Sequence, residues 1–356
     1  MGDTMNNFKL TFFALPLSIF LSTSVLAQVA LEEIVVTAQK TESSLQDTPI
    51  AVTAVTEATI KDLNIKNVVD MQGIAPNVML LPAPANNTGA SLAIRGGVAM
   101  NPAITWEPSV GTYLDGVYVG KTQGAIWDLV DLERVEILRG PQGTLYGRNT
   151  LAGAVNFISK KPSGEGMSGG LTLGNYGLKE GRFIADYRLG GNIFTKVVIH
   201  RKTRNGFVKN LPGPYGPFDG VVPNNLNPAT AELDLIDSKG FKLNIYYAGD
   251  QTTVDFAIDW TDQDNTPPHP QLGNIMAGWS TAFGVGASPL TGGLLLWPAE
   301  KHPRLGLDKI TSLDKDMLET SVVEGTALTI THETGLGELK LILAKRKLDW
   351  DDQLDM

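Results

Sequence analysis

The chain has 356 residues and a formal net charge of −9, from 29 Lys and Arg against 38 Asp and Glu. This acidic balance argues against nucleic-acid binding, because phosphate recognition needs a basic surface. The absence of cysteine excludes disulfides, thiolate metal sites and a cysteine nucleophile. The four histidines show no metal-binding spacing, so we expect no metal site. We also expect no cofactor and no catalytic residues.

Residues 1–27 have the pattern of a signal peptide. Lys9 precedes an uncharged, largely apolar run that continues to Ala30 and contains small residues around Ala27. The alternative is a membrane anchor, but a proline and several hydroxyl residues leave the run short of the ~20 apolar residues that a spanning helix needs. We therefore expect export, with cleavage after Ala27.

Residues 48–165 predict a small α+β domain, preceded by an extended segment over residues 28–47. The hydroxyl of Thr56 before an acidic first turn predicts a helix over residues 57–62, and Asn67 predicts the start of a second helix. Short runs rich in β-forming residues predict strands at 51–55, 78–81, 91–95, 110–114, 134–138 and 154–159. Mixed short elements with many glycine turns are typical of an α+β domain.

Residues 166–356 show the alternation of apolar and polar residues that is typical of strands with one apolar face. The seven clearest segments lie near 168–175, 179–189, 193–203, 239–249, 252–262, 323–333 and 337–349. Each is about ten residues long, the length of a tilted strand that crosses a bilayer, whereas strands of a soluble β-sandwich average nearer five or six. Tight turns alternate with long loops, at 205–239 and 262–322, as in an outer-membrane barrel. The lengths favour a transmembrane β-barrel over the sandwich.

Several motifs occur in one order along the chain. Residues 131–150 read DLERVEILRGPQGTLYGRNT and residues 152–162 read AGAVNFISKKP. Upstream lie LAIRG at 92–96, YLDGVYV at 113–119 and EEIVVTA at 32–38. These passages resemble the plug domain and the TonB box of TonB-dependent outer-membrane receptors. The resemblance implies an α+β plug followed by antiparallel strands of a membrane barrel.

The segment that resembles the TonB box is largely apolar and β-branched, with polar flanks. It can extend and offer a backbone edge to a partner sheet, in which main-chain hydrogen bonds supply the affinity. The alternative is a first strand of the following domain. The resemblance implies contact with the periplasmic domain of TonB through Glu33, Ile34, Val35, Val36, Thr37 and Ala38.

The resemblance also implies roles for plug residues. Plug arginines of this family meet barrel glutamates, which suggests Arg95, Arg139 and Arg148 as a plug–barrel lock; the alternative is three solvated arginines. Apical plug loops of such receptors contact substrate, although ordinary loop variability is the stronger explanation of these stretches. The candidate substrate contacts are Asn86, Asn87, Met100 and Trp106.

The function implied is active uptake of a scarce large solute across the outer membrane, gated by the plug and energised by TonB. Iron siderophores, cobalamin, carbohydrates and aromatic compounds all fit the family, so the expected partners are TonB, outer-membrane lipid and a small-molecule or metal-chelate substrate. One alternative is a ligand sensor that signals through TonB without transport. An exported hydrolase is disfavoured, because Gly-x-Ser-x-Gly at 166–170 continues as a strand where a nucleophile elbow needs a helix.

The chain departs from the family pattern in length. Receptors of this type have 22 strands around the plug, whereas 356 − 165 = 191 residues follow the plug here. At roughly 20 residues per strand and connection these supply about nine strands, too few to enclose the plug. We therefore expect an N-terminal portion of a receptor, with about seven to nine barrel strands in residues 166–356.

Overall fold

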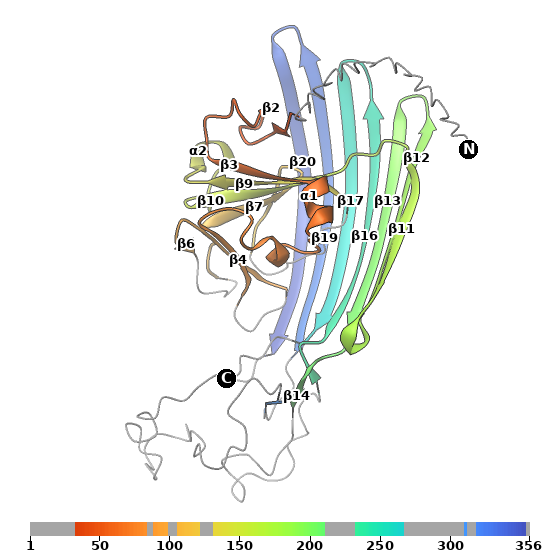
Figure 1. Cartoon of the computed structure of the whole chain (residues 1–356). Helices are drawn as coiled ribbons and strands as arrows, with labels where there is room; N and C mark the ends of the chain where they lie inside the picture. The colour runs from red at the N-terminus through yellow and green to blue at the C-terminus, as the bar shows by residue number, and fades with distance from the viewer. Residues whose placement is uncertain are drawn as a thin grey trace, which may run out of the picture. The chain divides into compact units, whose positions relative to one another are not determined.

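The computed structural model describes residues 33–83, 88–98, 105–121, 131–210, 232–266, 310–311 and 318–353. Almost all of them belong to one compact unit, Ile34–Met356. Two bodies of secondary structure follow one another along this unit (Figure 1). We call the elements from β1 to β10 the plug and the seven-stranded sheet that follows them the wall.

The plug contains two short helices, one 3₁₀ helix and ten strands. Its largest sheet has the strand order β3-β9-β10-β7-β8 and is mixed, because β10 and β7 pair in parallel; β4-β5-β6 and β1-β2 form two further sheets. The elements are β1 (Val35–Val36), β2 (Ser43–Ser44), β3 (Val52–Thr56), α1 (Glu57–Asp62), η1 (Val69–Met71), β4 (Val78–Pro82), β5 (Ala90–Ile94), β6 (Gly97–Val98), β7 (Val110–Leu114), β8 (Val117–Val119), β9 (Leu132–Arg139), α2 (Gly143–Tyr146) and β10 (Gly153–Ser159).

Local capping explains one predicted helix and limits the other. The Thr56 hydroxyl accepts the backbone N–H of Thr59 at 3.3 Å, which confirms the predicted start of α1. Asn67 also caps, since its Oδ1 accepts the N–H of Val69 at 2.8 Å. The prediction of a second α-helix is nevertheless wrong, because only the single 3₁₀ turn of η1 forms there and Gln72 leaves the helical region with ψ 132°.

Strand β9 separates two hydrophobic clusters in the plug. Val135 and Ile137 are fully buried in the larger cluster, with residues of α1, β4, β5 and β7. Leu138 lies in the smaller cluster, with Val36 and Ala38 from the N-terminal segment. Because successive strand residues point to opposite faces, β9 carries one core on each side.

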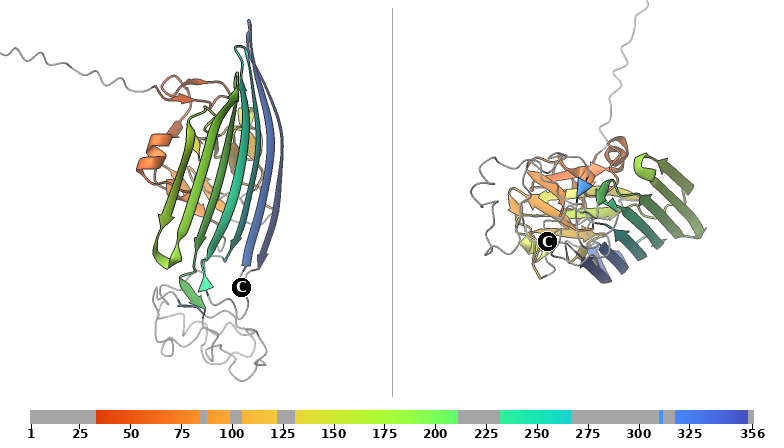
Figure 2. Two further views of the ribbon diagram at one scale, coloured as in Figure 1. Left: turned by 90° about the vertical axis from the view of Figure 1, so that its right-hand side faces the viewer. Right: turned by 90° about the horizontal axis from the view of Figure 1, so that it is seen from below.

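The wall is a single antiparallel sheet in which sequence neighbours pair throughout, in the order β11-β12-β13-β16-β17-β19-β20 (Figures 1 and 2). Its strands are β11 (Gly166–Leu173), β12 (Lys179–Gly190), β13 (Ile193–Arg204), β16 (Ile236–Ala248), β17 (Thr252–Asn265), β19 (Leu318–Thr334) and β20 (Gly337–Gln353). Each overlaps one of the seven predicted segments, and several are longer. Within the described residues β11 and β20 are each paired on one side only, so the barrel is incomplete.

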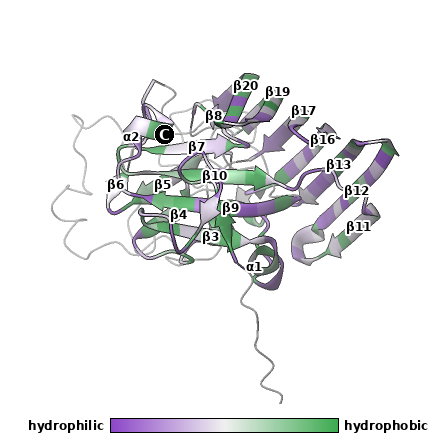
Figure 3. Ribbon diagram, turned by 90° about the horizontal axis from the view of Figure 1, so that it is seen from above, coloured by the Kyte–Doolittle hydropathy of each residue, from purple (hydrophilic) through white to green (hydrophobic). Residues whose placement is uncertain are grey.

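The register of the wall places unlike side chains on its two faces. One face carries a mostly apolar row across the sheet: Tyr187, Thr195, Ile245, Phe256, Leu328 and Leu343. Tyr187, Ile245 and Leu343 of this row are exposed. The adjacent row on the opposite face is polar or small: Asp186, Lys196, Asn244, Ala257, Ala327 and Ala344. The alternation along each strand is visible in Figure 3. The polar face is the one that contacts the plug, as described below.

Smaller elements complete the described chain: η2 (Asn175–Gly177) lies between β11 and β12, and β14 (Val208–Asn210), β15 (Glu232–Leu233) and β18 (Ile310–Thr311) form a small separate sheet. Among the described residues, no helix has the length and apolar character needed to cross a membrane.

Candidate functional site

The segment predicted to contact TonB is docked on the plug. Val35 and Val36 pair with Ser44 and Ser43 in the β1-β2 hairpin, and the Leu45 N–H donates to the Ile34 carbonyl at 2.8 Å. The Val36 side chain is fully buried, as is that of Ala38, whereas Val35 is 41% exposed. The segment therefore fills part of the smaller plug core, and Val35 is its most accessible apolar residue.

A buried carboxylate holds this segment in place. Glu136 on β9 is fully buried, and its Oε1 accepts the backbone N–H of Thr37 at 2.7 Å. The Thr37 hydroxyl lies within 3.2 and 3.3 Å of the two carboxylate oxygens. Arg134 donates through Nε to the same Oε1 at 2.9 Å, so the buried charge has a cationic partner. Asn156 Nδ2 lies 3.5 Å from Oε2.

Two tyrosines and a lysine enclose the segment from the other side. The Tyr146 hydroxyl donates to the Thr37 carbonyl at 3.4 Å, and Tyr113 donates to the Tyr146 carbonyl at 2.5 Å. The Lys40 ammonium lies 4.0 Å from the Tyr146 ring centroid and 5.0 Å from that of Tyr113.

The same enclosure shifts the pKa values of these groups. Burial, with the charge of Lys340, lowers the pKa of Lys40, although Glu136 opposes the shift. Burial raises the pKa of Tyr113 to about 12, and burial with the Glu136 charge raises the pKa of Tyr146. Both hydroxyls are therefore donors at neutral pH.

A buried lysine ties the wall to the end of the plug. Lys196 on β13 is 2% exposed, and its Nζ lies 3.1 Å from Asp131 Oδ2, which precedes β9, and 3.5 Å from Asp186 Oδ2 on β12. It also donates to the carbonyls of Lys160 and Lys161 at 3.0 and 3.1 Å. Burial raises the pKa of Asp131, and Lys196 opposes that shift.

A second wall lysine contacts the turn between β7 and β8. Lys242 Nζ on β16 lies 3.3 Å from Asp115 Oδ2 and also donates to the Ser159 hydroxyl. Asp115 accepts the Ser159 N–H at 2.7 Å and its hydroxyl at 2.8 Å. Burial alone would raise the pKa of Asp115, but Lys242 and the Ser159 hydrogen bonds outweigh it and hold that pKa below its ordinary value.

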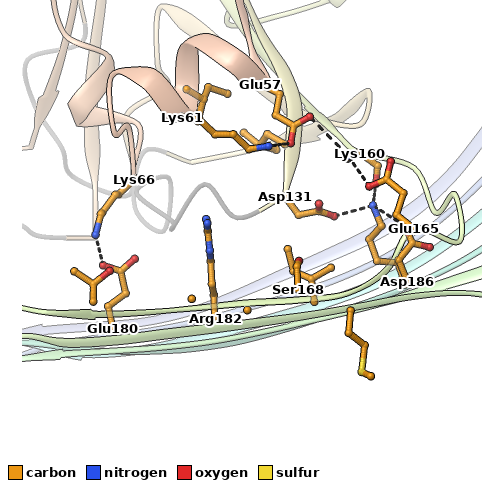
Figure 4. Close-up of a pocket in the computed structure, with 18 of the residues that line it drawn as sticks. Glu57, Lys61, Lys66, Asp131, Lys160, Glu165, Ser168, Glu180, Arg182 and Asp186 are labelled. Atoms are coloured by element: carbon orange, nitrogen blue, oxygen red, sulfur yellow. Dashed lines mark hydrogen bonds and ion pairs between the residues drawn. The ribbon is translucent and has the colours of Figure 1, made fainter.

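A polar cavity of about 700 Å³ lies between α1 and strands β11 and β12 (Figure 4). Lys66 of the plug and Glu180 of the wall pair at 2.5 Å at one side of it, and Arg182 points into it from β12. Its lining carries five cationic and five acidic side chains. Because these charges balance, the cavity is a polar seam between plug and wall with no preference for one sign of ligand.

At the opposite end of the wall from the β19-β20 turn, a plug loop touches β19. The Thr88 N–H donates to Glu319 Oε1 at 2.9 Å, the Thr88 hydroxyl donates to the same oxygen, and both residues are fully buried. Of the predicted substrate contacts, Trp106 is 58% exposed. Asn86, Asn87 and Met100 lie outside the described residues. The substrate-contact assignment therefore stays a prediction.

The three predicted lock arginines do not form ion pairs with the wall in the part of the chain that the structure describes. Arg95 lies against Gly140, where an added Cβ would come within 3.1 Å of its Nη1. Arg139 reaches the Pro76 carbonyl at 3.5 Å, and Arg148 is exposed. The lock role of these arginines stays a prediction. Among the described residues, the wall lysines Lys196 and Lys242 pair with plug carboxylates, and Lys66 of the plug pairs with Glu180 of the wall.

Sequence reasoning did not single out Glu136, Lys196 or Lys242. Glu136 lies within a recognised motif, but nothing in the one-dimensional pattern shows which residue faces Thr37. For Lys196 and Lys242, the period-two alternation indicates the wall face on which they lie. It does not indicate which plug carboxylates they pair with. No cluster of three or more His, Asp or Glu side chains suited to a metal ion occurs among the described residues.

Comparison with known proteins identifies the class. Residues 44–154 match the family model described as the TonB-dependent receptor plug domain. The chain carries a plug domain of the TonB-dependent receptor family, which confirms the resemblance found in the plug motifs.

Relatives by sequence are receptors and transporters. The chain is 28% identical over 183 residues to the catecholate siderophore receptor Fiu of Escherichia coli O6:H1, covering 49% of this chain and 22% of that protein. It is 34% identical over 134 residues to the ferrichrome outer membrane transporter/phage receptor of E. coli K12, covering 36% and 17%. The vitamin B12 transporter BtuB of Vibrio vulnificus is 29% identical over 157 residues, covering 43% and 25%. The match thus spans a quarter or less of each relative.

Solved structures share the fold. The ferric yersiniabactin uptake receptor FyuA from Yersinia pestis superposes with a TM-score of 0.64 at 17% identity, covering 86% of this chain and 42% of that one. The pyoverdine outer membrane receptor FpvA from Pseudomonas aeruginosa gives 0.63 at 14% identity, covering 89% and 40%. These structures confirm the predicted fold class, a plug followed by antiparallel barrel strands.

Proposed function

We propose that this chain acts in a TonB-dependent outer-membrane receptor that takes up a scarce large solute, gated by the plug and energised by TonB. The observation that carries the proposal is the placement of the plug's two ends. Lys40 follows the Glu33–Ala38 segment, and the charge of Lys340, near the short β19-β20 turn, acts on Lys40. Thr88 binds Glu319 where β19 begins, after a long connection. Short turns face the periplasm in such barrels and long loops face outward.

The names of the relatives support a proposal for the substrate class. They bind catecholate siderophores, ferrichrome and vitamin B12, which are all large metal chelates. We infer a metal chelate as the cargo, with carbohydrates and aromatic compounds as the other outcomes of a transport assay. Accumulation of iron-55 from ferric siderophores, measured in cells that express this receptor, would separate transport from sensing. A sensor would bind the chelate without accumulating the iron.

The two faces of the wall support an outer-membrane location. Residues 1–27 would export the chain, and the apolar row that includes Ile245 and Leu343 would face lipid, while the polar row faces the plug. Such a wall suits the outer membrane, the location that the name of the ferrichrome relative states.

Strand addition to TonB is tested with a peptide. A peptide of residues 32–39 should capture the periplasmic domain of TonB, and Val35→Pro should abolish capture because proline removes a ladder hydrogen bond. Val35→Thr keeps a β-branched residue with its N–H and is the matched control, with capture expected to persist. Equal capture by the proline and threonine peptides would refute strand addition.

A further inference from the structure

Residues 33–38, which we call the TonB-contact segment, cannot be bound by the plug and by a partner sheet at the same time. Strand addition needs the main-chain groups of residues 33–38 along one edge, with alternate side chains free for the partner. In the docked segment β2 already pairs with one edge, the Thr37 N–H is bonded to Glu136, and Val36 and Ala38 are fully buried. Docking and TonB binding are therefore competing states of one segment.

From this geometry we infer that Glu136 acts as a latch: it is a positioning residue that holds the segment on the plug and so sets the fraction of molecules whose segment is free to bind TonB. This rests on the proposed TonB contact and adds its regulation. Three of the segment's polar contacts with the plug end on this one carboxylate, whose Oε1 also accepts a hydrogen bond from Arg134. The contact from Tyr146 is longer, at 3.4 Å. Loss of the Glu136 charge therefore removes the strongest polar hold on the segment.

The consequence for TonB is quantitative. The apparent dissociation constant equals the intrinsic one divided by the fraction of molecules whose segment is free. A latch that keeps this fraction small weakens TonB binding by the same factor. Any event that displaces Glu136 or Thr37 strengthens it, and by linkage TonB binding favours the undocked plug.

The experiment uses the absence of cysteine in the natural chain. Val36→Cys, buried in the docked state, is labelled with a maleimide reagent in the full protein extracted in detergent, with neither TonB nor substrate present. We expect slow labelling, and acceleration on the order of 10- to 100-fold when Glu136→Gln is added. This is the factor expected for losing a charge-assisted hydrogen bond worth about 1.5–3 kcal/mol.

Three controls separate release from unfolding. Glu133→Gln removes a half-exposed neighbouring carboxylate that also pairs with Arg134, and should leave the labelling of Val36→Cys unchanged. Val35→Cys, already 41% exposed, should label quickly in either background. Val155→Cys, fully buried in β10, should stay protected when Glu136→Gln is present.

Two results would overturn the latch: unchanged labelling of Val36→Cys in the Glu136→Gln protein, or equal acceleration at Val155→Cys, which would mean general unfolding of the plug. Neither result touches the peptide capture by TonB, so failure of the latch and failure of strand addition are distinguishable. A gain in affinity of the intact Glu136→Gln protein for the TonB domain, by the same factor as the labelling, is the expected second readout.

Discussion

At the residue scale, the described junction between plug and wall depends on a few buried charges whose partners come from the other body. Lys196 has four acceptors within 3.5 Å, from Asp131, Asp186 and two carbonyls of the segment that joins β10 to β11. Asp186 in turn accepts the N–H groups of Ser163 and Gly164. A charge this enclosed is tolerated only when it is paired and hydrogen-bonded.

Removing that lysine should loosen the junction. Lys196→Met keeps much of the side-chain volume and leaves two buried carboxylates without their cation, a change that typically costs about 3–5 kcal/mol. We expect faster hydrogen–deuterium exchange in peptides that cover residues 131–164. Lys347→Met is the matched control, because Lys347 and its partner Asp349 are largely exposed. Exchange in the peptides that cover residues 131–164 should not change in this variant. Equal exchange in the two variants would contradict the anchoring role of Lys196.

At the element scale, strand β9 joins the parts of the plug. Its Glu136 faces the TonB-contact segment, while Val135 and Ile137 pack with β4 and β5 in the larger core. The loop between β4 and β5 contains Thr88, which binds Glu319 of the wall. One rigid strand is thus shared by the docked segment and by the core that supports the opposite end of the plug.

The close approach of β10 to its neighbours gives an element-scale prediction. A Cβ on Gly153 would lie 2.3 Å from the Leu138 carbonyl oxygen and 2.7 Å from Ile94 Cδ1. Gly153→Ala should therefore force β9 and β10 apart and destabilise the plug by about 1–3 kcal/mol, the usual cost of overpacking. Thermal unfolding followed by exchange of plug peptides measures it.

The control for that variant is Gly143→Ala in α2, where an added Cβ meets nothing within 4 Å. It should be neutral or slightly stabilising, because alanine favours helix over glycine. A stable Gly153→Ala plug would show that the two strands are not packed as described.

Much of this fold was predictable from local pattern, and the failures share a cause. The wall strands follow from period-two alternation, and α1 follows from the Thr56 cap. The second helix failed because Asn67 caps only a single turn, after which Gln72 leaves the helical region. The Thr37–Glu136 contact joins residues 99 positions apart, and Lys242 meets Asp115 across 127. Contacts of that separation depend on how the plug meets the wall, which no local pattern contains.

At the scale of the whole molecule, two parts of the plug lie toward opposite ends of the wall. The β4-β5 loop touches the wall where β19 begins, and the TonB-contact segment lies toward the β19-β20 turn. A solute bound at the first end can act on TonB only if it favours the state in which the second end is undocked. The proposed uptake therefore predicts that the Glu33–Ala38 segment meets TonB in the periplasm.

The most direct test is disulfide cross-linking in cells between this protein and a TonB that carries one cysteine in its periplasmic domain. Val35→Cys should cross-link, and more strongly when a transported chelate is present. Leu336→Cys lies fully exposed in the β19-β20 turn and should give only background. No cross-link at Val35→Cys, or an equal yield at Leu336→Cys, would contradict a TonB-energised receptor that works through this segment.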